Sequence, residues 1–110
     1  MKVNELAQKL SLNLLAGEGG LDNEILTCYS GDLLSWVMGR ANEGSAWLTV
    51  MGNVNAIAVA TLTDCACIIL TEDAPLDEDA RQRADSQSVP VLSTSLSAYE
   101  LAVKISEVLK

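Results

Sequence analysis

The sequence predicts a single α/β domain over residues 1–110, in which a mostly parallel sheet is flanked by helices. Three observations favour this fold. The chain has 110 residues, which is the size of one domain. From residue 47 onward, short apolar runs alternate with helical segments, and the connections between them are short and polar. The run CACIIL at residues 65–70 is apolar throughout, which is typical of a central strand covered on both faces.

The first part of the chain contributes two helices and two strands to this pattern. A helix is predicted at residues 3–10, because its apolar residues recur on one helical face. Short strands are predicted at residues 13–16 and 25–29, with a glycine-rich turn between them. Asp32 is expected to cap a helix that continues to Met38.

The second part alternates regularly between strands and helices. The predicted strands are residues 47–51, 65–70 and 89–92. The predicted helices are residues 54–62, 77–87 and 97–109. Ser97 and Glu100 stand three residues apart and form a capping box, which marks the start of the last helix. Strands that alternate with helices in this way pair in parallel, so their carboxyl ends meet at one edge of the sheet.

The composition excludes several classes of function. Seven basic and fifteen acidic residues give a net charge of −8, so nucleic acid and anionic membranes are not expected partners. Histidine is absent, which excludes Ser-His-Asp and Cys-His catalysis and zinc sites that use imidazole. The N-terminal segment lacks the apolar centre of a signal peptide, and polar residues interrupt the longest uncharged run, 44–63, so we expect a cytoplasmic protein.

The cysteines and the acidic residues do not predict a metal site. Cys65 and Cys67 would face the same side of a strand, but a thiolate site usually needs four ligands and only Cys28 could add another. We interpret the three as ordinary apolar residues and expect neither metal nor cofactor. The acidic residues between 72 and 79 lack the spacing of a calcium loop, and three of them suit the start of a helix.

Two predicted helices are more apolar than the surface of a small monomer usually is. The helix ending at Met38 has Ser35 as its polar interior residue, and the helix 54–62 has only Asn55 and Thr61. A helix that is apolar all round is usually buried on all sides. We therefore predict a homodimer, with an interface that includes Leu33, Leu34, Trp36, Val37, Ile57 and Ala58. The alternative is that the sheet and loops of one chain cover both helices.

Polar residues follow the predicted strands where their carboxyl ends meet. Gly52 and Asn53 follow one strand, Thr71 follows the next, and Thr94 and Ser95 follow the last. Their hydroxyl, amide and backbone N–H groups suit hydrogen bonds to a small polar ligand rather than acid–base chemistry. Ordinary turn and cap chemistry would explain the same residues.

A family resemblance rests mainly on the block YSGDLLSWVMG at residues 29–39. It resembles a block of the DRTGG domain family, which is related to the N-terminal domain of HPr kinase. The segments 3–15, 43–49, 68–71 and 89–94 are similar to other elements of that family, so the resemblance spans nearly the whole chain and implies an α/β sandwich.

The family signature is an Asp-Arg pair after a glycine and Thr-Gly-Gly after a later strand. Here Asn53-Val54 follow Gly52 in place of Asp-Arg, and Glu72-Asp73 follow Thr71 in place of the two glycines. The chain therefore resembles a divergent, standalone member of the family. The negative charge of Glu72 and Asp73 also disfavours phosphate-rich ligands at that strand end.

The resemblance implies an accessory domain rather than an enzyme. Members of the family occur beside CBS domains in regulatory pyrophosphatases, in some phosphotransacetylases and as standalone chains, and subunit association recurs among them. We therefore predict a non-catalytic regulatory or assembly module that forms a homodimer and docks on a partner enzyme or kinase. The alternative is a small-molecule sensor that binds a nucleotide-like ligand at the strand ends. An enzyme would depend on carboxylates such as Asp32, Glu72 or Asp73, whose spacing indicates no reaction class.

Overall fold

Five strands form one sheet in the computed structural model, which describes residues 1–109. The strands are β1 (Asn13–Ala16), β2 (Thr27–Ser30), β3 (Ser45–Thr49), β4 (Cys67–Leu70) and β5 (Val91–Ser93). Their order across the sheet is β1–β5–β4–β3–β2. The strands β2 to β5 are parallel, and β1 pairs antiparallel with β5 at one edge. The mostly parallel sheet is therefore confirmed. Lys110, the last residue of the predicted domain, lies outside the described residues.

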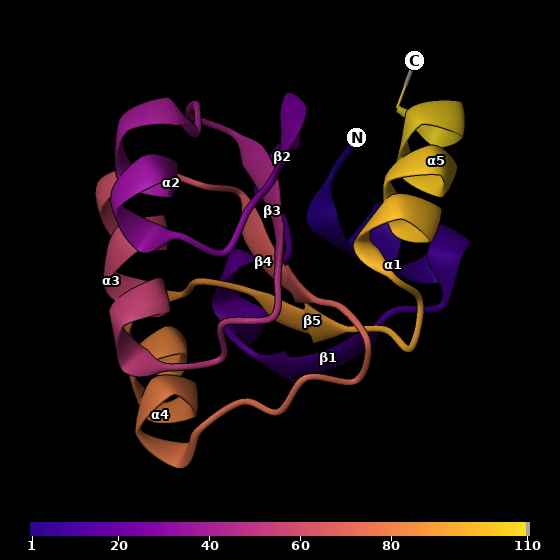
Figure 1. Ribbon diagram of the computed structural model, residues 1–110. Coiled ribbons are helices and arrows are strands. Elements are labelled where there is room, and N and C mark those ends of the chain that lie inside the picture. Colours follow the sequence, from indigo (N-terminus) through magenta and orange to yellow (C-terminus); the bar gives the residue numbers. More distant parts are fainter. Residues whose placement is uncertain (110) are drawn as a thin grey trace.

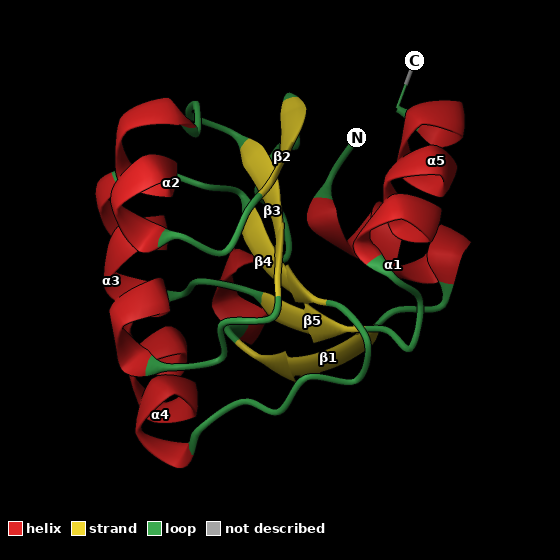
Figure 2. Cartoon of the chain, viewed as in Figure 1, coloured by secondary structure: helices red, strands yellow, loops and turns green. Residues whose placement is uncertain are grey.

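Helices cover both faces of this sheet (Figure 1 and Figure 2). One layer contains α2 (Leu34–Arg40), α3 (Val54–Leu62) and α4 (Glu78–Gln87), each of which connects two neighbouring parallel strands. The other layer contains α1 (Val3–Leu10) and α5 (Ala98–Val108), which come from the two ends of the chain. A short 3-10 helix, η1 (Glu18–Gly20), follows β1. None of the helices described is long and apolar enough to cross a membrane.

The core has two parts, one on each face of the sheet. Trp47, Ile68 and Leu70 pack with α2, α3 and α4, whereas Leu48 and Ile69 pack with α1 and α5. The alternation arises because successive side chains of a strand point to opposite faces. All five residues of β3 are buried, so both faces of this strand are covered, whereas Val50, in the predicted run 47–51, is 40% exposed.

Most predicted elements are confirmed, with small shifts at their ends. The helix at residues 3–10, the strand at 13–16 and the helix at 54–62 have the predicted bounds. The capping box of the last helix is present, with a hydrogen bond of 3.2 Å from the Glu100 amide to Ser97 Oγ. The strand predicted at 47–51 lies at Ser45–Thr49, two residues earlier.

The cap predicted for Asp32 is wrong. The helix α2 begins at Leu34 after Leu33, and it has no side-chain cap. Asp32 instead binds the end of β3, where its Oδ1 accepts hydrogen bonds from Thr49 Oγ1 at 2.7 Å and from the Val50 amide at 3.0 Å. A contact between residues seventeen or more positions apart cannot be read from a local capping pattern.

The apolar helix α3 is covered within one chain. It packs against α2 on one side and α4 on the other, and Ala56, Ile57, Val59 and Ala60 are buried between these helices and the sheet. Val37 of α2 is also fully buried in this part of the core. Val37 and Ile57 therefore belong to the core of the single chain rather than to its surface.

Candidate functional site

The predicted ligand residues lie at the carboxyl edge of the sheet, where several of their polar groups bind the chain itself. Asn53 caps α3, because its Oδ1 accepts a hydrogen bond of 2.9 Å from the Ala56 amide. The Gly52 carbonyl accepts a hydrogen bond of 2.8 Å from the Asp77 amide. A Cβ atom at Gly52 would lie 1.9 Å from the carbonyl oxygen of Pro75, so this position requires glycine for close packing.

Thr71 and Thr94 lie on neighbouring loops and are both buried. The Thr71 amide donates to the Thr49 carbonyl at 3.1 Å, and the Thr94 amide donates to the Leu70 carbonyl at 3.0 Å. Thr94 Oγ1 accepts a hydrogen bond of 3.2 Å from the Leu96 amide. The structure thus brings Thr71 and Thr94 together as loop anchors, and it leaves Ser95 exposed to solvent.

The loop after β4 has an unusual backbone. Glu72 and Asp73 both have a φ of 56°, the left-handed region that glycine adopts most easily. The loop is held in this shape from the β5 side, because the Glu72 amide donates to the Leu96 carbonyl and the Asp73 amide to the Thr94 carbonyl, both at 2.9 Å. Hydrogen bonds between the two loops therefore stabilise a conformation that the residues themselves disfavour.

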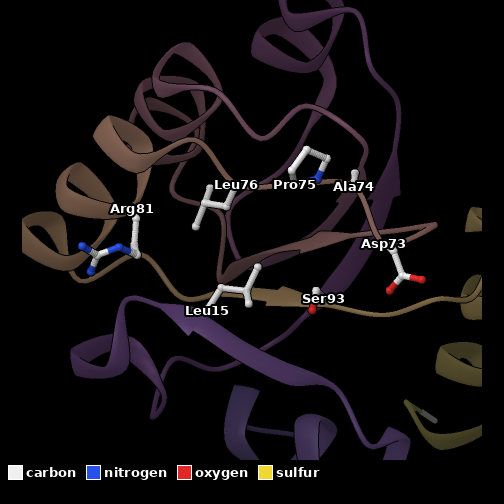
Figure 3. Close-up of a pocket in the computed structure, with 7 residues that line it drawn as sticks. All are labelled: Leu15, Asp73, Ala74, Pro75, Leu76, Arg81 and Ser93. Atoms are coloured by element: carbon white, nitrogen blue, oxygen red, sulfur yellow. The ribbon is translucent and has the colours of Figure 1, made fainter.

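A cleft of about 330 Å³ opens beside this loop (Figure 3). Its walls come from β1, β5, the loop after β4 and α4, through Leu15, Ser93, Asp73, Ala74, Pro75, Leu76 and Arg81. In Figure 3 the Leu15 and Leu76 side chains lie between Arg81 at one end and Asp73 at the other. The cleft thus has an aliphatic middle, with the Ser93 hydroxyl and the Asp73 carboxylate toward one end.

The charge of Arg81 is already balanced by its neighbours on α4. Its Nε donates to Glu78 Oε1 at 3.1 Å, and its Nη1 donates to Asp85 Oδ2 at 3.3 Å. The hydrogen bonds from Arg81 hold the pKa of Glu78 below its usual range. The carboxylate of Asp73 and the paired Arg81 suit an uncharged or cationic ligand with hydrogen-bond donors better than a free phosphate.

The sequence predicted a ligand site at the carboxyl edge of the sheet, but not the residues that line this cleft. Asp73 lies two residues after the predicted Thr71, and Ser93 directly precedes the predicted Thr94. The predicted ligand residues themselves do not line the cleft. Leu15 and Arg81 were missed. Leu15 reaches the cleft because β1 pairs antiparallel with β5, and no local pattern predicts that pairing.

Cys65 and Cys67 are buried in different parts of the core, and Cys28 is half-buried on β2. Cys65 precedes β4 and packs in the layer of α2, α3 and α4, whereas Cys67 packs in the layer of α1 and α5. The prediction that they share a face of one strand is therefore wrong, because the strand begins only at Cys67. Burial raises the pKa of the Cys67 thiol far above its usual range. Within residues 1–109, His, Cys, Asp and Glu side chains form no group of three that could hold a metal ion.

Comparison with known proteins now identifies the family. The sequence pattern of the DRTGG domain matches residues 5–108. The chain belongs to the DRTGG domain family, which is a family of regulatory domains. Comparison with curated proteins gave no match.

The DRTGG fold is also present in a solved structure of the CBS and DRTGG domains of the regulatory region of Clostridium perfringens pyrophosphatase, complexed with the activator diadenosine tetraphosphate. The TM-score is 0.72 at 10% sequence identity, over 93% of this chain. This chain spans 44% of that one. At this identity the likeness shows a shared fold.

In the resemblance described above, Glu72 and Asp73 stand where the DRTGG signature has two glycines. Both positions are left-handed, and a pair of glycines would adopt this backbone without a steric cost.

Replacing either residue with glycine should therefore stabilise the fold. We expect Glu72→Gly and Asp73→Gly each to raise the free energy of unfolding by up to about 1 kcal/mol, since a left-handed residue costs roughly 1–2 kcal/mol and glycine returns part of this as chain entropy. Urea denaturation measures the change. Asp22→Gly is the control, because Asp22 is an exposed carboxylate outside the left-handed region. An equal effect of all three variants would contradict the explanation.

Asn53 should act on stability through its cap. Asn53→Ala removes the acceptor for the Ala56 amide, and we expect it to lower the free energy of unfolding by about 1 kcal/mol. Asn53→Asp retains an acceptor and should remain close to the wild type. Thermal and urea denaturation measure both variants. A loss of the same size in Asn53→Asp would show that the cap is not the cause.

Proposed function

We propose that this chain is a non-catalytic regulatory module that forms a homodimer and docks on a partner enzyme or kinase. The observation that carries the proposal is the apolar surface that α2 leaves uncovered. Leu33 and Trp36 are 59% and 55% exposed, and their spacing of three residues places them side by side at the start of α2. Met38 is 42% exposed, but it lies two residues after Trp36 and on another side of the helix. Clustered exposed apolar side chains are typical of interaction surfaces, and tryptophan is enriched where binding energy is concentrated.

This exposed surface differs in part from the interface predicted from the sequence. Leu33 and Trp36 remain in the set, and Leu34 and Ala58 are partly exposed. Val37 and Ile57 leave it because they are buried in the core. Leu62, at the end of α3, is 73% exposed and adds an apolar side chain to the same helical layer.

The environment of Trp36 supports its role as an anchor. The Arg40 guanidinium lies 4.0 Å from the centre of its ring, which is cation–π geometry. This contact orders the indole and leaves more than half of its surface free for a partner.

The polar groups at the carboxyl edge support the non-catalytic part of the proposal. Asp32, Asn53 and Thr94 accept hydrogen bonds from backbone amides, so their oxygens hold loops and a helix in place. These oxygens therefore have structural roles, which supports a domain that binds rather than reacts.

Trp36→Asp tests the dimer. A carboxylate at the centre of an apolar interface would be buried without a partner, so we expect the dimer dissociation constant to rise about thirtyfold or more. Analytical ultracentrifugation measures the constant. Tyr99→Asp is the matched control, because Tyr99 is an aromatic residue that is 79% exposed on the opposite layer. A folded Trp36→Asp variant with the affinity of the wild type would remove this surface from the interface.

A small-molecule sensor is the second candidate, supported by the cleft between β1, β5 and the loop after β4. The similar pyrophosphatase region is complexed with diadenosine tetraphosphate, which contains adenosine groups as well as phosphates. The aliphatic middle of the cleft and the Asp73 carboxylate fit a nucleoside better than a polyphosphate.

Titration with adenosine and with diadenosine tetraphosphate tests the sensor. We expect adenosine to bind more tightly, and Ser93→Ala to weaken it about three- to tenfold through the loss of one hydrogen bond. Ser95→Ala is the control, because Ser95 is exposed and does not line the cleft. Calorimetry that detects no binding of either compound, or equal effects of both variants, would contradict this candidate.

A further inference from the structure

The two edges of the sheet differ in how they are protected. At one edge, a β-bulge between Leu14 and Ala16 interrupts the register of β1. At the other edge, β2 pairs regularly with β3 over Thr27–Ser30. The residues of β2 include neither a charged side chain nor a proline, the features that usually prevent pairing at an exposed edge.

The open backbone groups of β2 can be assigned from its hydrogen bonds to β3. The Thr27 amide donates to the Gly44 carbonyl and the Gly31 amide donates to the Leu48 carbonyl. Bonded and outward-facing residues alternate along an edge strand, so the N–H and C=O groups of Cys28 and Ser30 face away from the sheet. Just before β2, this edge is covered, because the Ile25 amide donates to the Met1 carbonyl.

A groove of about 490 Å³ runs between this open edge and α5. On the helix, its lining is a stripe at helical spacing, formed by Ala102, Ile105, Ser106 and Leu109. The residues of β2 that line it include Cys28 and Ser30, whose backbone groups are open. The groove and the free hydrogen-bonding groups therefore belong to one surface.

We infer that the β2 edge pairs with the β2 edge of a second copy of this chain, in antiparallel orientation about a two-fold axis. The inference rests on the proposed homodimer and names the surface at which the copies meet. Two copies that each carry a charge of −8 repel one another least where uncharged surfaces meet, and among residues 1–109 none that lines this groove is charged.

The alternation of β2 also fixes the register. Antiparallel pairing places Cys28 opposite Ser30 of the second copy and Ser30 opposite Cys28, so that all the outward-facing groups of both residues are bonded. Tyr29 then lies on the two-fold axis, opposite Tyr29 of the second copy. The helix α2 follows β2 directly and lies at the same edge of the sheet, on the opposite face from α5 (Figure 1).

Sedimentation equilibrium of Ser30→Lys tests this edge, with Asn13→Lys as the matched control. Both residues are exposed on edge strands and both variants add one positive charge, but Asn13 lies on β1. We expect Ser30→Lys to raise the dimer dissociation constant about tenfold or more, because each copy would place a lysine inside the paired edge. Asn13→Lys should match the wild type, and circular dichroism verifies the fold of both variants.

Amide hydrogen exchange of the wild type gives a second measurement. The amides of residues 28 and 30 should exchange more slowly as the protein concentration rises, and in Ser30→Lys the same protection should require a protein concentration about tenfold higher or more. Dimers that are equally stable in Ser30→Lys and Asn13→Lys would overturn the inference. In that case, a wild-type dimer that Trp36→Asp dissociates would support the proposed homodimer, with α2 rather than the β2 edge as its interface. A wild type that is monomeric at millimolar concentration would overturn both the proposed homodimer and the pairing of two β2 edges. A strand of another protein would then be the remaining candidate to pair with β2.

Discussion

The structure depends on the burial of β3 and β4 on both faces of the sheet. Every residue of these strands is buried, so neither face can be left to solvent and each needs a layer of helices. The connections between parallel strands supply α2, α3 and α4 to one face. The ends of the chain supply α1 and α5 to the other, which is why Leu6 of α1 and Leu101 of α5 share one cluster.

The carboxyl edge of the sheet is held together by hydrogen bonds between its loops. The loop after β4 is fixed by amide–carbonyl hydrogen bonds to the loop after β5, and Asp32 and Asn53 fix the ends of β3 and the start of α3. These contacts give the cleft beside Leu15 and Ser93 a rigid frame.

The exposed large apolar residues lie on both helical layers and near both edges of the sheet. Other side chains occupy the inner face of the α2, α3 and α4 layer, and Trp36 and Leu62 are exposed to solvent. The open edge of β2 is a consequence of the same topology, since the parallel order ends there and no later strand pairs with it. The proposed pairing of two copies would cover the open edge of β2, and α2 with Trp36 lies at this same edge.

The sequence by itself determined the local elements. The 3.6-residue repeat of Val3 to Leu10, the Asn53 cap and the Ser97–Glu100 box act within a few residues of one another, and each predicted its helix correctly. The continuous apolar run ending at Leu70 indicated a buried parallel strand for the same reason. The resemblance of the block 29–39 to the DRTGG family was also a local pattern, and the family match confirms it.

The tertiary structure alone decided what these elements contact. Asp32 binds β3 instead of capping α2, and Val37 and Ile57 lie in the core instead of on a surface. The cleft depends on the pairing of β1 with β5, and Glu72 and Asp73 are left-handed because carbonyls of a distant loop hold their amides. Periodicity shows that a helix has an apolar face, but contacts between residues far apart in the chain determine whether its own domain covers that face.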